Sequence, residues 1–122
     1  MTLTTLVIGA RASLRESAIA QALVPGVTCA VILEGLPDGH SALDGHPIAP
    51  GLVRIAPGCL CCTGNLVLRV TLNRILRHPP ARLFISLASA GHVGHVGQLR
   101  QWLSQAPYDS LLTLEATLEA AS

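Results

Sequence analysis

Residues 3–33 read LTTLVIGARASLRESAIAQALVPGVTCAVIL and contain the patterns of a strand, a helix and a second strand in succession. The β-rich run at 3–8 ends at Gly9, and residues 13–23 then repeat apolar side chains on one helical face. A Pro-Gly pair ends this helix. Residues 27–33 are almost continuously apolar, as a parallel strand buried on both faces requires. This stretch therefore predicts a βαβ unit.

The rest of the chain continues the alternation of strands and helices. By residue number we expect a loop at 35–51, a strand at 52–56, an amphipathic helix at 66–77, a strand at 82–87, a glycine-rich connection at 91–97, a helix at 98–105 and a last strand or extended tail at 111–118. This alternation predicts an α/β fold with a parallel sheet flanked by helices. In such folds ligands bind beyond the carboxyl ends of the strands, where the Gly9 turn and the segment around Cys59 should lie.

The composition fits one domain over residues 1–122, because 50% of the residues are hydrophobic and can build a core. Only 12% are charged, which leaves an apolar surface and favours burial against a partner. A net charge of +1 and 2% aromatic residues argue against nucleic acid. No stretch approaches the roughly 18 apolar residues of a membrane span, and the N-terminus lacks a secretion signal. We therefore expect no membrane association and a cytoplasmic protein.

Three of the four cysteines stand together in the sequence Gly58-Cys59-Leu60-Cys61-Cys62. Residues two apart on an extended segment project to the same side, so Cys59 and Cys61 can bind one ion through sulfurs about 2.3 Å from it. Cys62 can add a third thiolate at the start of the following turn. Thiolates are favoured near a helix N-terminus and suit borderline or soft ions. The cluster predicts a metal site, and zinc is the ion that we expect there.

A tetrahedral zinc site needs a fourth ligand. The candidates are water, Glu34, His40, His46, His92 and His95. His92 and His95 are the preferred histidines, because their connection should lie at the same edge of the sheet as the cysteines. Two other interpretations of the cluster stay open: inert core cysteines, or a redox pair of Cys59 and Cys61. The fourth cysteine, Cys29, lies in an apolar run and is expected in the core.

The segment 57–63, with a strand before it and a helix after it, resembles the Gly-Cys-x-Cys-Cys motif of the CobW-type GTPase metallochaperone family. Residues 82–85 and the later Gly91-His92 resemble that family's strand ending in an acidic residue and its Thr-Gly-Leu-Gly-His-Pro-like segment. Pro107-Tyr108 and residues 114–118 resemble the segment that leads into its next strand. The likeness spans most of the chain but stops before the family's guanine-reading motif and C-terminal domain. It implies a truncated, P-loop-GTPase-like domain of the Rossmann-like three-layer type, with a role in metal handling.

The first turn departs from that family's Gly-x-x-Gly-x-Gly-Lys-Thr pattern and keeps only Gly9. Leu14 fills a position where the backbone must approach phosphate closely, and Arg15 replaces the Lys that reaches the phosphates. Glu16 puts a negative charge where the magnesium-binding hydroxyl belongs. Ser86 stands at the acidic position of the later strand. The resemblance therefore implies a phosphate loop that has lost GTP and magnesium binding.

The same residues also fit a structural helix start. Ser13-Leu14-Arg15-Glu16 matches a capping box, in which the Ser hydroxyl and the Glu side chain bind free backbone N–H groups. We expect that Gly9, Ser13 and Arg15 mark a phosphate loop that has degenerated into this structural helix start. Weak anion binding by Arg11 and Arg15 is the alternative at this helix N-terminus.

Together these features predict a metal-binding protein of CobW type that does not hydrolyse nucleotide. Its expected roles are a zinc carrier, a zinc buffer, or the regulatory partner of an intact paralogue, and a homo-oligomer or a complex with that paralogue would cover its apolar surface. The first alternative is a nucleotide-dependent GTPase metallochaperone whose missing parts come from another subunit. A thiol redox protein and an interaction protein with vestigial cysteines are the others.

Overall fold

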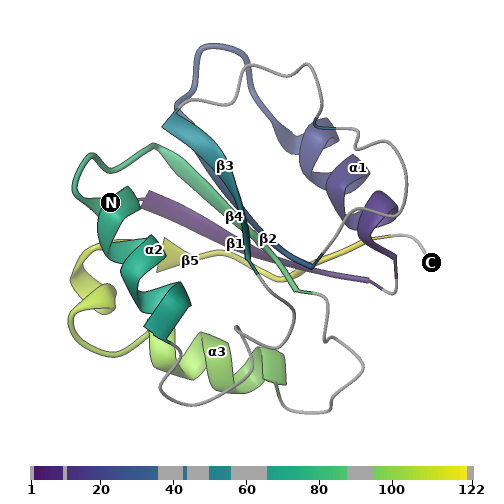
Figure 1. Ribbon diagram of the computed structural model, residues 1–122. Coiled ribbons are helices and arrows are strands. Elements are labelled where there is room, and N and C mark those ends of the chain that lie inside the picture. The colour runs from purple at the N-terminus through teal and green to yellow at the C-terminus, as the bar shows by residue number, and fades with distance from the viewer. Residues whose placement is uncertain are drawn as a thin grey trace.

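The computed structural model describes residues 2–9, 11–35, 43, 50–55, 66–87 and 95–120. The described residues form a six-stranded sheet in which the paired strands run parallel, and helices cover both faces (Figure 1). The strand order is β3-β2-β4-β1-β5, and β6 pairs with the end of β1. The predicted α/β fold, with a parallel sheet flanked by helices, is confirmed.

The elements appear in nearly the predicted sequence. They are β1 (Thr2–Ile8), α1 (Ala12–Ala22), β2 (Cys29–Glu34), β3 (Pro50–Ile55), α2 (Leu66–Leu76), β4 (Arg82–Ser86), α3 (His95–Leu103), the 3-10 helix η1 (Tyr108–Ser110), β5 (Leu112–Leu114) and β6 (Leu118–Glu119). Within the described part of the chain, no helix combines the length and apolar character needed to cross a membrane.

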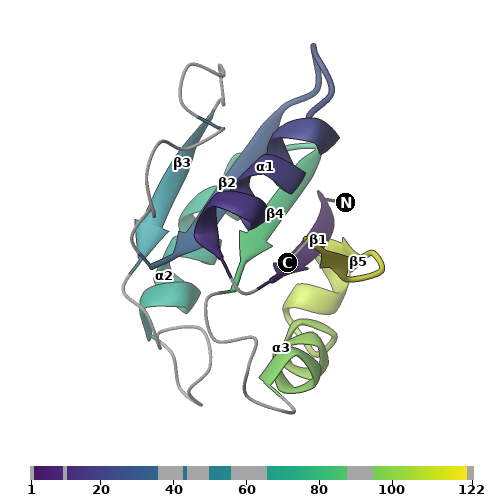
Figure 2. The same cartoon turned by 90° about the vertical axis from the view of Figure 1, so that its right-hand side faces the viewer.

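The core is divided into two layers by the sheet. Strand β2 shows why, because its alternate side chains point to opposite faces. Ala30 and Ile32 belong to the cluster that includes residues of α2 and α3, whereas Cys29, Val31 and Leu33 belong to the cluster that includes Ile19 of α1. Figure 2 shows the same division, with α1 on one side of the sheet and α2 and α3 on the other. The continuous apolar run of β2 is therefore explained by burial on both faces.

The largest errors in the predicted boundaries lie at α3 and at the last strand. Helix α3 begins at His95 rather than Gln98 and so includes Gly97. A glycine inside a helix costs roughly 1 kcal/mol relative to alanine, and this cost is offset by the burial of Leu99 and Leu103 in the core.

The predicted last strand at 111–118 is divided into β5 and β6. Between them, the guanidinium of Arg100 donates hydrogen bonds to the carbonyl of Glu115, at 2.8 Å, and to the hydroxyl of Thr117, at 3.3 Å. The N–H of Glu115 still donates to the carbonyl of Thr4 in β1, at 2.8 Å, so this segment is joined to both the sheet and α3.

Candidate functional site at the carboxyl edge of the sheet

The turn after β1 is occupied by the side chain of Arg15, which is only 3% exposed. Its Nε donates a hydrogen bond of 2.8 Å to the hydroxyl oxygen of Ser86, the last residue of β4. Its terminal nitrogen donates a second bond of 2.7 Å to the carbonyl oxygen of Gly9. The guanidinium of Arg15 is thus bound both by the turn itself and by the end of β4.

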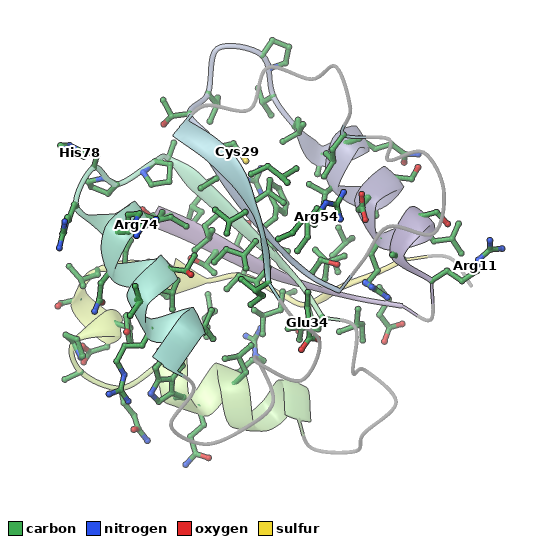
Figure 3. All side chains as sticks on the ribbon, in the orientation of Figure 1. Arg11, Cys29, Glu34, Arg54, Arg74 and His78 are labelled. Carbon is green, nitrogen blue, oxygen red and sulfur yellow. The ribbon has the colours of Figure 1, made fainter. Side chains whose placement is uncertain are left out.

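The next residue of α1 makes a second buried contact. The carboxylate of Glu16 is 2% exposed and lies 3.2 Å from a guanidinium nitrogen of Arg54, whose other terminal nitrogen lies at 3.4 Å. Arg54 belongs to β3, and Figure 3 shows its side chain directed towards α1. This ion pair links the first helix to the strand that leads into the cysteine segment.

The predicted capping box is wrong. Helix α1 begins at Ala12 with Arg11 as its N-cap, and that cap makes no side-chain hydrogen bond to the helix. Ser13 therefore lies inside the first turn rather than at the cap. The physical reason is the burial of Glu16. Its carboxylate gains an ionic partner in Arg54, and a charge-assisted contact of this kind is stronger than a neutral hydrogen bond.

Gly9 is held in a conformation that suits glycine, with φ of +153°. A Cβ atom added there would lie 2.9 Å from the Cβ of Ala120 and 3.3 Å from the Cγ of Arg15. Ala120 reaches this position because β6 pairs with Val7 and Ile8 of β1, and its N–H donates to the carbonyl of Ile8 at 2.8 Å. Ala120, the residue after β6, therefore packs directly on the turn.

Glu34 is the predicted metal ligand for which the structure describes the side chain. It ends β2, is 2% exposed and pairs in register with Ile55, the last residue of β3 (Figure 3). The N–H of Gly35 donates a 2.9 Å hydrogen bond to the carbonyl of Ile55, which joins the two strand ends. The cysteine segment follows β3 in the chain, so Glu34 lies beside the point where that segment begins.

Strand alternation places the two groups of residues on opposite faces of the sheet. Ser86 shares a face with Phe84, which packs with Ile19 of α1, so the Arg15 contacts lie on the α1 side. Glu34 alternates with Leu33, which packs with the same α1 cluster, and so belongs to the opposite face. Helices α2 and α3 cover that face. Because a helix that follows a parallel strand runs back along it, both helices begin at the carboxyl edge, the same edge as Glu34.

The other predicted ligands are placed only in part. Cys59, Cys61, Cys62, His40, His46 and His92 lie outside the described residues, and His95 is the first residue of α3. Among the residues that the structure describes, no group of three His, Cys, Asp or Glu side chains is arranged to hold a metal ion.

Cys29 occupies the core, as predicted, and is 7% exposed. Burial raises the pKa of its thiol to about 11, and the nearby charge of Arg82 lowers it by a smaller amount. The Cys29 sulfur is therefore protonated near neutral pH and poorly suited to metal binding.

Sequence reasoning missed Arg54. A single arginine in a short edge strand carries no pattern, and its role depends on a carboxylate that is distant in the chain. The available indication was Glu16, an acidic residue early in α1, because a carboxylate needs a cationic partner once it is buried.

Comparison with known proteins adds one relative. The chain is 32% identical over 125 aligned positions to "Zinc chaperone YeiR" of Escherichia coli (strain K12). The alignment covers 97% of this chain and 37% of that protein, so the chain spans a little over a third of its relative's length. No protein-family model and no solved structure matches the chain. With its cysteine motif, its parallel α/β fold and this relative, the chain belongs to the CobW-type family.

Proposed function

We propose that the chain binds zinc as its cargo through the thiolates of Cys59, Cys61 and Cys62 and acts as a metallochaperone. The observation that supports this most directly is a dense thiol cluster, placed after β3, in a chain related to a zinc chaperone. Thiolate sulfur suits zinc, and ligands must be deprotonated to bind it. In the described residues no alternative metal-binding group competes with this cluster.

Glu34 completes the site as its fourth ligand in this proposal. Its carboxylate is buried at the carboxyl edge, beside the residue from which the cysteine segment departs. Asp and Glu oxygens bind zinc at distances similar to those of histidine nitrogens. His92 and His95 are the competing candidates, and His95 begins a helix on the same face of the sheet as Glu34.

We propose further that the protein does not hydrolyse nucleotide. A P-loop needs a cation that reaches the β- and γ-phosphates and a carboxylate that helps to hold magnesium. Here the cation of Arg15 bonds to Gly9 and Ser86, and Glu16 carries a charge that repels triphosphate. We infer that the chain serves as a zinc carrier or buffer in the cytoplasm, or as the regulatory partner of an intact paralogue.

Zinc titration with thiol counting tests the metal site. The purified chain should bind about one zinc per chain, release protons on binding and then resist alkylation at its reactive thiols. Cys61→Ser should weaken zinc binding by about a hundredfold or more, since even the loss of a group that only supports a ligand costs 10–100-fold.

Cys29→Ser is the matched control, because it removes a sulfur that is buried in the core. Its zinc affinity should equal that of the parent chain. Equal alkylation rates with and without zinc at every thiol would exclude the site, and disulfide formation between Cys59 and Cys61 under mild oxidation would then favour a redox role. Glu34→Gln and His95→Ala, measured side by side, decide which residue is the fourth ligand.

A further inference from the structure

The arginines of the chain are distributed unevenly between internal contacts and one exposed surface. Between residues 45 and 108 the sequence contains six arginines and no Asp or Glu. Three of these arginines are engaged within the fold: Arg54 with Glu16, Arg82 with Glu115, and Arg100 with the backbone before β6. The remaining three all belong to α2 or its end, and all are exposed.

These residues, with the exposed positions between them, form what we call the α2 basic face. It comprises Arg69, Val70, Asn73, Arg74, Arg77 and His78. The spacing of these residues, three and four apart, places them along one side of the helix. Val70 is 48% exposed and is the apolar residue in the middle of this face. Arg74 and His78 are visible at the end of α2 where the chain turns towards β4 (Figure 3).

Stability of the helix does not account for this face. Arg74 is in the last turn, where a cation interacts favourably with the helix dipole, but Arg69 is in the first turn, where a cation is unfavourable. Arg74 and Arg77 are three residues apart at the end of α2, a spacing at which like charges destabilise a helix by roughly 0.2–0.5 kcal/mol. Within the described residues, none of the three arginines forms an ion pair with a carboxylate. The face therefore carries charge that no described carboxylate balances.

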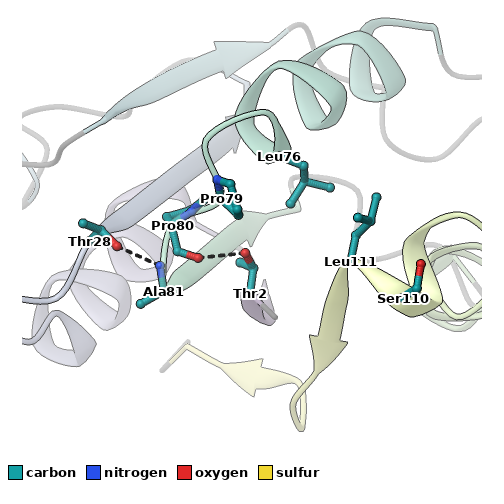
Figure 4. Close-up of a pocket in the computed structure, with 8 residues that line it drawn as sticks. All are labelled: Thr2, Thr28, Leu76, Pro79, Pro80, Ala81, Ser110 and Leu111. Atoms are coloured by element: carbon teal, nitrogen blue, oxygen red, sulfur yellow. Dashed lines mark hydrogen bonds between the residues drawn. The ribbon is translucent and has the colours of Figure 1, made fainter.

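An open cavity of about 510 Å³ adjoins the end of this face, at the amino edge of the sheet (Figure 4). Leu76, Pro79 and Pro80 form one wall, and Leu111, which is 40% exposed, stands opposite. The hydroxyl of Thr2 donates to the carbonyl of Pro80 at 2.7 Å, so this polar group is satisfied within the wall. The cavity thus offers mainly apolar contact.

Arg77 and His78 connect the cavity to the basic face, because they lie in the chain between Leu76 and Pro79 of its wall. Tyr108, shortly before the opposite wall in the chain, donates a hydrogen bond of 3.4 Å from its hydroxyl to the side-chain oxygen of Asn73 on α2. Asp109 directly precedes the opposite wall in the chain. Its side chain is exposed and forms no ion pair with a described arginine.

We propose that the α2 basic face and this cavity together dock an acidic, partly apolar segment of a partner protein. Carboxylates of the segment pair with Arg69, Arg74 and Arg77, and an apolar side chain enters the cavity against Leu111. A protein segment fits better than nucleic acid, because the surface combines its charge with an apolar cavity whose lining contains no Phe, Tyr or Trp on which a base could stack. This inference goes beyond zinc binding and does not depend on it.

Fluorescence anisotropy with a labelled peptide of Glu-Glu-Leu repeats tests the proposal. The matched control peptide has Gln-Gln-Leu repeats, and labelled oligothymidylate tests nucleic acid. The parent chain should bind the acidic peptide, more weakly as sodium chloride is raised, and bind the control peptide at least about tenfold more weakly. The triple variant Arg69→Gln/Arg74→Gln/Arg77→Gln should lose about tenfold in affinity for the acidic peptide, as expected for several exposed ion pairs.

Two single variants separate this surface from a general charge effect. Arg11→Gln removes an exposed cation outside α2 and should leave the affinity unchanged, whereas Leu111→Ser should weaken binding through the cavity. Circular dichroism and melting curves establish that each variant is folded. Equal binding of the acidic and control peptides, or an unchanged affinity in the triple variant, overturns the proposal. Tighter binding of oligothymidylate than of the acidic peptide overturns it in favour of nucleic acid.

Discussion

The Nε atom of Arg15 lies 2.8 Å from the hydroxyl oxygen of Ser86, and this hydrogen bond joins the first helix to the end of β4. Arg15 also donates a hydrogen bond of 2.7 Å to the carbonyl of Gly9. Under the proposed function, Arg15 and Ser86 take positions at which a P-loop protein binds phosphate and magnesium. The bonds that they make within the fold contribute to the stability of the turn.

Arg15→Met should lower the free energy of unfolding by roughly 2–4 kcal/mol, because two charge-assisted hydrogen bonds are lost and Ser86 and Gly9 each lose a donor. Urea denaturation followed by circular dichroism measures this change. Arg11→Met is the matched control, since Arg11 is exposed, and its effect should stay within about 0.5 kcal/mol. Equal stabilities of the two variants would show that the Arg15 contacts contribute nothing.

GTP with magnesium should not raise the melting temperature of the chain more than inorganic phosphate does. Under the proposed function, Arg15→Lys does not change this result, because Glu16 and Ser86 take the positions at which a P-loop has its magnesium-binding hydroxyl and carboxylate. Differential scanning fluorimetry with both ligands makes the comparison. A clear rise with GTP alone would support the nucleotide-dependent alternative instead.

Glu16 and Arg54 should show energetic coupling. Arg54→Met should destabilise the protein by roughly 1–3 kcal/mol, because the buried carboxylate of Glu16 loses this cation. The double variant Glu16→Gln/Arg54→Met should be more stable than the sum of the single changes predicts, with a coupling of about 0.5–3 kcal/mol. Chemical denaturation of the four proteins completes the cycle. Strictly additive effects would mean that the ion pair is without energetic consequence.

Stability should fall in alkaline solution because of Cys29. Its pKa rises from 9.0 to about 11 on folding, so the folded state holds the thiol proton more tightly than the unfolded state. The resulting stabilisation is complete below pH 9 and is lost as the pH rises through 11, with a maximum of about 3 kcal/mol. Cys29→Ala should unfold with a weaker dependence on pH between these values. Parallel denaturation curves at neutral and alkaline pH provide the measurement.

The chain should associate with itself when no other partner is present. A charged fraction of 12% leaves little polar surface, and Leu3, Val24 and Val53 are each more than a third exposed. Light scattering at several concentrations, with zinc and with a chelator, should show mass increasing with concentration and responding to zinc. A constant monomer mass in a cooperatively folded sample would show that the domain satisfies its own surface.

The sequence was sufficient for the parallel sheet, because buried strands and amphipathic helices leave separate periodic patterns. Strand β2 and helix α2 were found in this way. The start of α3 was missed because Gly97 indicated a loop, while the burial of Leu99 and Leu103 extended the helix across it. A local sequence pattern does not include the stabilisation that a helix gains when its side chains pack in the core.

The candidate site, too, could be predicted from the sequence only in part. The chemical types at Arg15, Glu16 and Ser86 could be recognised from the sequence, but their partners could not. Glu16 was expected to cap its own helix, and instead it pairs with Arg54, 38 residues away in the chain. A local hydrogen bond and a distant ion pair both satisfy a buried carboxylate, and only the packed structure decides between them.

The contact between Gly9 and Ala120 limits what the glycine can reveal about function. A Cβ atom at position 9 would lie 2.9 Å from the Cβ of Ala120, so packing alone is enough to require a glycine there. The presence of Gly9 therefore carries no information about whether the turn binds a nucleotide.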